Sequence, residues 1–295
     1  MKTTLKRKKN RIWELDFLRG FAILLVVFDH LFYDYGMFFG AWRNCGVPFL
    51  EKLNSISLSY LNGDLRFFWR PAFLFIFFSV SGICTALSRN NFLRGIKLWV
   101  VAVFITLISF LGEIVADTPF ILFGVLHCLA VVIVVYAIIE FCIKGVFFLV
   151  EKLRKKESKQ WVKTLVFTVV CLAVAGVTLW LHFRYNPRLY DVESNYTVSE
   201  VDGKKWGMFF FSHEWWTSDY FPLFPFISFF FFGAALSKIL YPKKRTLFPL
   251  LQGPWNAPVS FAGKHSLIVY LLGQVLGIGL GALLSLAFLG KSLLF

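Results

Sequence analysis

Long apolar runs separated by short polar segments dominate the chain. A helix needs about 20 consecutive apolar residues to cross about 30 Å of hydrocarbon. Seven runs approach that length, and they lie near residues 15–36, 67–87, 98–116, 119–143, 162–183, 222–241 and 266–289. We therefore predict a single all-α domain over residues 1–295, a multi-pass transmembrane helical bundle of about seven spans.

Three stretches between these runs do not have the pattern of simple spans. Residues 37–66 mix aromatic with polar side chains, and residues 246–262 contain several prolines, which prevent one regular helix. We expect both stretches to be interfacial or re-entrant segments. Residues 184–221 are rich in Tyr, Trp and acidic residues. They are predicted to form the largest loop outside the membrane, where they cap the bundle or bind an acceptor.

The distribution of charge predicts the orientation of the bundle. The net charge is +14, and most of the 31 Lys and Arg residues lie in the tail 1–13 and in the second, fourth and sixth loops. The opposite loops hold most of the acidic residues. This alternation predicts a cytoplasmic N-terminus and an external C-terminus. No nucleic-acid reading module accompanies the basic tail, so we exclude nucleic acid as a partner.

Composition favours a membrane protein without a metal site. Hydrophobic residues make up 58% of the chain, and its 37 Phe residues suit a lipid-facing surface. The five Cys residues include no CxxC pair, and no HExxH motif occurs, so we expect neither a metal centre nor a disulfide framework. Small residues at 277–282 allow close helix contact, within one bundle or in a homodimer.

Ionisable residues inside the apolar runs are candidates for function. Each costs about 2.5–3.5 kcal/mol on insertion scales, so such residues are seldom kept without a role. At 1.5 Å per helical residue, His30 and Glu113 lie at similar depths, and His127 lies roughly 12 Å below the outer face. His30 and Asp34 are four residues apart and share a helical face, where the carboxylate can orient the imidazole.

These observations leave three interpretations open. His30, Glu113 and His127 form one catalytic layer, or they are separately satisfied residues that tie helices together. A third possibility is a proton or anion pathway in a transporter or channel. At the cytoplasmic end we expect Asp16 and Arg19 to form a local ion pair. Arg70, at the outer end of the second run, is either a snorkelling anchor or an acceptor contact.

Two strings at the start of the chain resemble a known family. They are Glu-Leu-Asp-Phe-Leu-Arg-Gly-Phe-Ala-Ile at 14–23 and Phe-Asp-His-Leu-Phe-Tyr-Asp at 28–34. Both are similar to the catalytic domain of heparan-α-glucosaminide N-acetyltransferase, and especially to its small bacterial relatives. Further similar strings follow in order at 79–95, 123–128, 219–226 and 263–271, so that the resemblance covers most of residues 11–275. The opening is also similar to the broader membrane O-acyltransferases.

The resemblance implies a transmembrane acyltransferase of the bacterial plasma membrane. Acetyl-CoA from the cytoplasm is the donor, a sugar amine or hydroxyl of an external glycan is the acceptor, and membrane lipid surrounds the bundle. The site residues that we predict are His30 as general base or acetyl carrier, Asp34 as its orienting group, His127 and Glu113 as partners, Arg19, Arg89, Arg94 and Lys97 for CoA, and Arg70 and Asp219 for the acceptor.

The chain departs from the family pattern at two places. The eukaryotic enzyme has a proposed catalytic histidine in the loop after the first span, whereas residues 37–66 here contain no histidine. His30 instead aligns with a polar asparagine near the acetyl site. Relatives also often have His-Gln-Pro in the last span, where this chain has Gly273, Gln274 and Val275. Three alternatives follow: the catalytic role lies with His30 or His127, the acceptor differs from that of the eukaryotic enzyme, or the chain is a non-catalytic membrane protein that keeps a degenerate site.

Overall fold

The computed structural model describes residues 11–116, 121–185 and 219–290, and every regular element in these ranges is helical. The elements are α1 (Trp13–Tyr33), the π-helical η1 (Asp34–Phe38), the 3₁₀ helix η2 (Gly40–Asn44), α2 (Pro48–Leu61), α3 (Asp64–Ile83), η3 (Cys84–Leu87), α4 (Asn91–Ala116), α5 (Val125–Arg154), α6 (Gln160–Tyr185), α8 (Phe226–Leu240), η5 (Pro249–Leu251), η6 (Pro254–Asn256), α9 (Ala257–Lys264) and α10 (Ser266–Leu289). The predicted all-α class is confirmed.

Five of these helices are long and apolar enough to cross a membrane: α3, α4, α5, α6 and α10. Helix α8 is apolar but has only 15 residues. Helix α1 has 21 residues and carries Glu14, Asp16, Arg19 and Asp29, which lower its hydropathy. Each predicted run overlaps one of these seven helices, so the chain is an α-helical membrane bundle. The count of seven spans and their orientation stay predictions.

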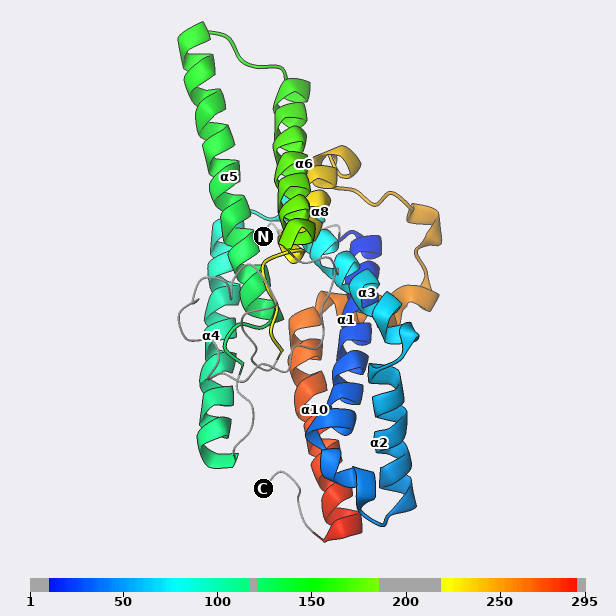
Figure 1. Cartoon of the computed structure of the whole chain (residues 1–295). Helices are drawn as coiled ribbons and strands as arrows, with labels where there is room; N and C mark the ends of the chain where they lie inside the picture. The colour runs from blue at the N-terminus through cyan, green and yellow to red at the C-terminus, as the bar shows by residue number, and fades with distance from the viewer. Residues whose placement is uncertain (1–10, 117–120, 186–218, 291–295) are drawn as a thin grey trace, which may run out of the picture.

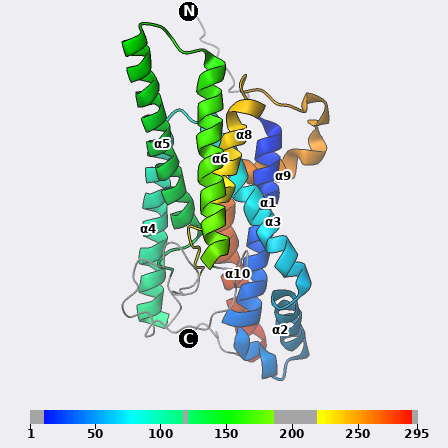
Figure 2. The ribbon, with the colours of Figure 1, turned by 45° about the horizontal axis from the view of Figure 1, so that its top comes forward.

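The helices form two neighbouring groups, which Figures 1 and 2 show from two directions. Helices α4 and α5 pack together on one side, and α1, α3 and α10 lie on the other. Helix α8 joins the groups because it packs against α3, α5 and α6. The α5–α6 turn and the loop after α8 lie toward one end, termed here the basic end, while α2 lies at the other.

Glycines allow two pairs of helices to approach unusually closely. A Cβ atom at Gly82 of α3 would collide with the backbone carbonyl oxygen of Phe230 in α8. A Cβ atom at Gly20 of α1 would likewise collide with the Val259 carbonyl oxygen of α9, and one at Gly263 with that of Asp16. Gly20 and Gly263 belong to strings that carry the family resemblance. Their role in this structure is to hold α1 against α9.

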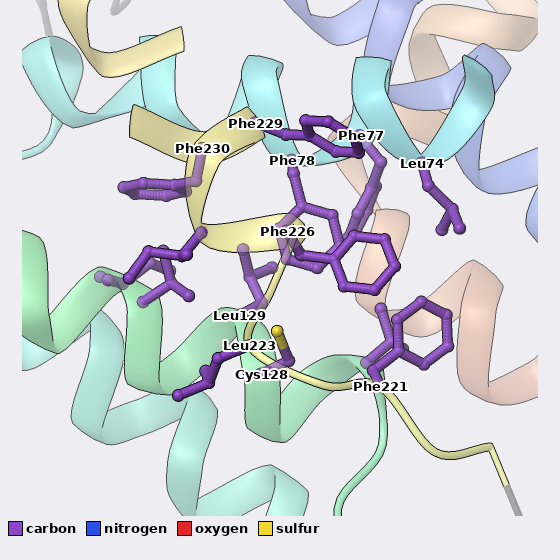
Figure 3. Close-up of a cluster of buried hydrophobic side chains, with 14 of the residues drawn as sticks. Leu74, Phe77, Phe78, Cys128, Leu129, Phe221, Leu223, Phe226, Phe229 and Phe230 are labelled. Carbon is purple, nitrogen blue, oxygen red and sulfur yellow. The ribbon is translucent and has the colours of Figure 1, made fainter. Parts of the chain in front are cut away.

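The largest cluster of buried side chains lies where α3, α5 and α8 meet, as Figure 3 shows. Its labelled members are Leu74, Phe77, Phe78, Cys128, Leu129, Phe221, Leu223, Phe226, Phe229 and Phe230. The non-helical segment 219–225 passes through this cluster, and the Phe221 N–H donates to the Phe123 carbonyl at 3.1 Å. The core therefore fixes the position of Asp219, the first described residue of that segment.

Two of the predicted irregular stretches are described in detail. Residues 37–66 contain η2 and α2, and the buried Trp42 donates its indole N–H to Ser285 of α10 at 2.9 Å. Residues 246–262 form short 3₁₀ turns that lead into α9. The predicted loop 184–221 and the tail 1–13 lie mostly outside the described residues.

Candidate active site

His30 lies in the last turn of α1 and faces a carboxylate from a distant part of the chain. Its Nε2 atom is 3.6 Å from Oδ1 of Asp219, and the two side chains are only 18% and 7% exposed. The separation exceeds a normal hydrogen bond, and Asp219 Oδ1 has no hydrogen-bond partner among the described residues. Catalytic hydrogen bonds are often long before substrate binds, so this pair has the geometry of an unengaged His–Asp dyad.

Tyr270 of α10 holds the other oxygen of the same carboxylate. Its hydroxyl donates to Asp219 Oδ2 at 3.0 Å, and its ring meets the His30 ring edge-on at 5.8 Å between centroids. Asp219 has a φ of 52°, a left-handed conformation that non-glycine residues seldom adopt. Strained backbone of this kind is often found at functional sites. Three segments thus converge on one buried cluster of His30, Asp219 and Tyr270.

Asp34 lies one turn beyond His30, where the helix changes its geometry. Helix α1 ends at Tyr33, and Asp34 begins the π-helical turn η1. The Asp34 side chain is buried and faces Gly277 of α10, since a Cβ atom there would lie 3.4 Å from Asp34 Oδ2. The carboxylate that the structure places against His30 is therefore Asp219. An orienting role for Asp34 stays a prediction.

Asp29 fixes the rotation of α1 and thereby the direction of His30. Its carboxylate accepts from Arg66 Nε at 2.8 Å and from the Tyr60 hydroxyl at 3.1 Å, and it lies 3.6 Å from Arg70 Nε. Successive helical side chains are about 100° apart. Because Asp29 is held against α2 and α3, His30 is turned toward α10 and Asp219.

Arg70 links this ion cluster to the segment that carries Asp219. Its guanidinium carbon lies 5.9 Å from the centroid of the Phe221 ring, a cation–π contact, and its side chain is 12% exposed. Arg70 therefore contacts a residue that follows Asp219 by two positions in the sequence. Asp219 was the other residue predicted to contact an acceptor. The structure thus links Arg70 to the segment that carries Asp219.

His127 has a different environment from His30. Its Nδ1 atom accepts the backbone N–H of Gly124 at 3.3 Å, so its proton is on Nε2. Nε2 then donates to the Thr106 hydroxyl at 3.2 Å, which itself donates to the Ile121 carbonyl. Both ring nitrogens are therefore engaged. In the part of the chain that the structure describes, no hydrogen bond or ion pair joins His127 to His30.

Glu113 lies near the end of α4 on a half-buried position between the exposed residues Leu111 and Ile114. Among the described residues, no ion pair or hydrogen bond joins it to either histidine. The predicted layer of three titratable groups is therefore not assembled in this structure. His30 is instead accompanied by Asp219, and catalytic roles for His127 and Glu113 stay predictions.

A cavity of about 820 Å³ opens at the basic end of the bundle. It is lined by polar and apolar side chains of α1, η3, α4, α5 and α10. Its charged lining residues are Arg11, Asp16, Arg19, Arg94, Lys97 and Lys244. Three of the four residues predicted for CoA line this cavity, namely Arg19, Arg94 and Lys97. The fourth, Arg89, is exposed and does not belong to its described lining.

Local contacts set the charge of this cavity. Asp16 pairs with Arg11, whose Nε donates to its carboxylate at 2.9 Å, so the predicted ion pair between Asp16 and Arg19 is wrong. This hydrogen bond raises the pKa of Arg11. Arg19 reaches across to η3 and donates to the Cys84 sulfur at 2.7 Å, while Arg94 donates to Ser81 of α3 at 2.6 Å. Asp16 is thus neutralised, and the remaining basic groups leave the cavity positively charged.

A second, apolar cavity lies between wall residues of the basic cavity and Tyr270 of the histidine cluster. Its volume is about 70 Å³, and it shares Phe77, Leu98, Leu129, Ser266 and Leu267 with the wall of the first. Its lining also includes Tyr270. Because Tyr270 contacts both His30 and Asp219, the two cavities and the buried cluster follow one another through the bundle.

Sequence reasoning missed Tyr270 and the pairing of His30 with Asp219. Tyr270 lies within one of the strings that resemble the family, yet an aromatic residue in an apolar span carries no distinct signal of function. In the described ranges, no group of three or more His, Cys, Asp or Glu side chains is placed to hold a metal ion. His30, Asp219 and Tyr270 form an acid–base cluster, and this cluster is the candidate site.

Comparisons with known proteins agree with the strings noted above. No curated protein and no solved structure matches the chain. The model of one protein family, described as heparan-alpha-glucosaminide N-acetyltransferase, catalytic, matches residues 11–275. That range contains the basic cavity, the apolar cavity and all three residues of the histidine cluster. The chain therefore belongs to the heparan-α-glucosaminide N-acetyltransferase catalytic family, a family of membrane acetyltransferases.

Proposed function

We propose that this protein transfers an acetyl group from cytoplasmic acetyl-CoA to a sugar amine or hydroxyl on the opposite side of the membrane. The observation that supports the proposal is the succession of a basic cavity, an apolar cavity that shares its wall, and Tyr270, whose ring contacts His30. A donor that enters from one side and an acceptor that enters from the other require such a path, with the reacting group inside the membrane.

The basic cavity suits the charged part of CoA. CoA carries several phosphate charges, and guanidinium groups bind phosphate through paired, charge-assisted hydrogen bonds. Arg19, Arg94 and Lys97 supply this charge around a volume of about 820 Å³. The pantetheine arm of CoA then extends toward the apolar cavity and Tyr270, and the thioester at the end of this arm reaches the level of His30.

His30 supplies the proton transfer that the reaction needs. The acceptor nitrogen or oxygen attacks the thioester carbonyl carbon while neutral His30 takes its proton. The carbon–sulfur bond then breaks, and the CoA thiolate leaves and receives a proton. Asp219 stabilises the imidazolium that forms in between, because its free Oδ1 faces the ring at 3.6 Å. In a two-step route, His30 itself attacks the thioester and passes the acetyl group on.

Arg70 and Asp219 are suited to receive the acceptor. Asp219 contacts His30 directly, Arg70 contacts Phe221, and neither residue belongs to the described lining of the basic cavity. Sugars carry hydroxyls that donate to carboxylates and accept from guanidinium groups. A sugar held between these side chains presents its reacting group to His30.

Reconstituted vesicles with all protein molecules in one orientation test the proposal. Acetyl-CoA labelled in the acetyl group is added on the side of the basic cavity, and amino sugars and glycans are placed on the opposite side. Label should appear on an acceptor on the opposite side, and free CoA should accumulate where the donor was added. Acetylation that requires donor and acceptor on the same side contradicts transfer across the membrane.

The same vesicles separate the enzyme from the alternative, a transporter or channel. That alternative has the support of the intramembrane charges at Asp29, Asp219 and Arg70. Flux of protons, anions or sugars through the protein, with no acetylated product and no CoA released, would overturn the proposed activity in favour of transport.

A further inference from the structure

The loop between α8 and α9 presents large apolar side chains away from the bundle. Leu250 is 97% exposed, Trp255 62%, Leu251 56% and Phe248 52%. Figure 1 shows this loop extending to one side of the helices, beside α1 and α3. A contiguous group of exposed apolar residues outside the spanning helices marks a contact surface.

Glu14 holds the start of this loop in place. Its buried carboxylate accepts hydrogen bonds from the Thr246 hydroxyl at 2.6 Å, the Leu247 backbone N–H at 2.7 Å and the Tyr241 hydroxyl at 3.3 Å. Three bonds to one carboxylate fix the path of the chain directly before the apolar residues. Glu14 therefore has a structural role that its place in the opening string did not indicate.

Aromatic side chains of α1 hold the rest of the loop. The Trp13 indole donates to the Phe248 carbonyl at 3.0 Å. Trp255 packs edge-on against Trp13 and Phe17, with ring centroids 6.0 and 5.5 Å apart, and donates to the Leu251 carbonyl at 3.0 Å. The exposed apolar residues are thus displayed on a fixed framework, which reduces the entropy lost when they bind a partner.

Three consecutive basic residues precede the apolar ones. Lys243, Lys244 and Arg245 are exposed, and none of them takes part in an ion pair in the described part of the chain. The sequence contains no Asp or Glu after Asp219, so no acidic side chain nearby in the sequence neutralises them. Their charge is complementary to an anionic surface.

We propose that residues 243–256, termed here the interfacial loop, bind the anionic phospholipids of the membrane in which the bundle lies. Lys243, Lys244 and Arg245 contact lipid phosphates, and the side chains of Leu250, Leu251 and Trp255 enter the adjacent apolar layer. Clustered cations next to exposed Leu and Trp are the combination by which interfacial segments bind anionic lipid. Lipid is favoured over a protein partner because the loop extends sideways from membrane-spanning helices. The proposal does not depend on the acetyl-transfer activity.

Hydrogen exchange in nanodiscs measures this binding directly. The full-length protein is placed in nanodiscs of phosphatidylcholine alone or of phosphatidylcholine with phosphatidylglycerol, and exchange is followed in peptides from residues 243–256. Protection should increase when phosphatidylglycerol is present. In parallel, native mass spectrometry counts the phosphatidylglycerol molecules that stay bound after extraction into detergent.

Matched variants separate this loop from general attraction to the basic end. The double variant Lys243→Gln, Arg245→Gln should weaken phosphatidylglycerol binding about 25-fold, since each cation near an anionic surface contributes about fivefold. Lys244 is left unchanged because it also lines the basic cavity. The control removes the same charge near the α5–α6 turn as Lys156→Gln, Lys159→Gln, and should keep the protection of residues 243–256. The variant Leu250→Ser, Leu251→Ser should lower protection in both lipids, because it removes the apolar contacts.

Three results would overturn the proposal. The first is equal protection of the interfacial loop in the two lipid compositions. The second is a control variant that loses as much bound phosphatidylglycerol as the loop variant. Protection that rises with protein concentration rather than with phosphatidylglycerol would show instead that a second protein covers this surface.

Discussion

His30 and His127 both point into the bundle, but their imidazole rings have different partners. Both ring nitrogens of His127 are hydrogen bonded, one to the Gly124 backbone and one to Thr106, at the beginning of α5. His30 faces a carboxylate oxygen that has no hydrogen bond, next to a cavity lined by Tyr270. A histidine whose two ring nitrogens are both hydrogen bonded supports a helix. A histidine that faces a carboxylate oxygen without a hydrogen bond is positioned to accept a proton from a substrate.

The sharpest test of this comparison is the removal of the His30 imidazole. In His30→Ala the acceptor loses its base, and kcat for acetyl transfer should fall by about 100- to 10,000-fold. His127→Ala, measured in the same vesicles, is the matched control for loss of a buried imidazole. Circular dichroism and size-exclusion chromatography check that both variants are folded. Equal losses of kcat in the two variants would contradict the distinction between the histidines.

Parts of this arrangement follow from the sequence, and parts do not. Apolar run length predicts the helices, because the hydrocarbon thickness fixes the number of residues needed. Depth in the membrane does not give the direction in which a side chain points, however. His30 and His127 can therefore be predicted at similar depths and still face different neighbours. The backbone keeps the i, i+4 relation of His30 and Asp34, since the Asp34 N–H donates to the His30 carbonyl, but the Asp34 side chain lies against Gly277 of α10.

The rest of the site depends on contacts between segments that are far apart in the sequence. Asp219 reaches His30 because the core of α3, α5 and α8 holds the segment 219–225, and no local spacing encodes that path. Arg89 and Lys97 have the same charge and neighbouring positions in the sequence, yet only Lys97 lines the basic cavity. Lys97 lies on α4, which packs against α5, whereas Arg89 lies in the short segment before α4.

Neutralising Asp219 should have the next largest effect. Asp219→Asn keeps the size of the side chain and the hydrogen bond from Tyr270 but removes the charge that faces His30. A hydrogen bond to a charged group contributes about 1.5–3 kcal/mol, so kcat should fall about 10- to 100-fold. The KM for acetyl-CoA should change little. Asp34→Asn is the comparison variant, and a larger loss there would assign the orienting role to Asp34.

Tyr270 tests whether the carboxylate must be held in place. Tyr270→Phe keeps the ring against His30 but removes the hydroxyl that donates to Asp219 Oδ2. Loss of this one hydrogen bond should lower kcat by about 3- to 10-fold. The pH dependence of kcat should shift as well, because the charges around His30 (Asp219, Asp29, Asp34, Arg66 and Arg70) are rebalanced. A purely structural role for the hydroxyl would lower stability and leave that pH profile unchanged.

Lys97 and Arg89 should differ in their effect on the KM for acetyl-CoA, because only Lys97 lines the basic cavity. Lys97→Gln removes a cation from the wall of the basic cavity and should raise the KM for acetyl-CoA by about three- to fivefold, the scale of an exposed charge contact. Arg89→Gln removes a cation outside that described wall and should leave KM unchanged. Initial rates at varied acetyl-CoA measure both. The reverse order would place the donor on a different route.

His127 should affect stability rather than chemistry. In His127→Ala the Gly124 N–H at the start of α5 loses its acceptor, and the Thr106 hydroxyl loses a donor. Loss of a helix cap costs about 1 kcal/mol, so the midpoint of thermal unfolding in detergent should fall by a few degrees, while kcat stays at the wild-type value. His127→Asn is the informative second variant, because its amide oxygen can still accept the Gly124 N–H. Recovery of the melting midpoint in His127→Asn, without any change in kcat, would show that the His127 ring acts as a cap. A lowered kcat in His127→Asn at normal stability would instead return His127 to the catalytic site.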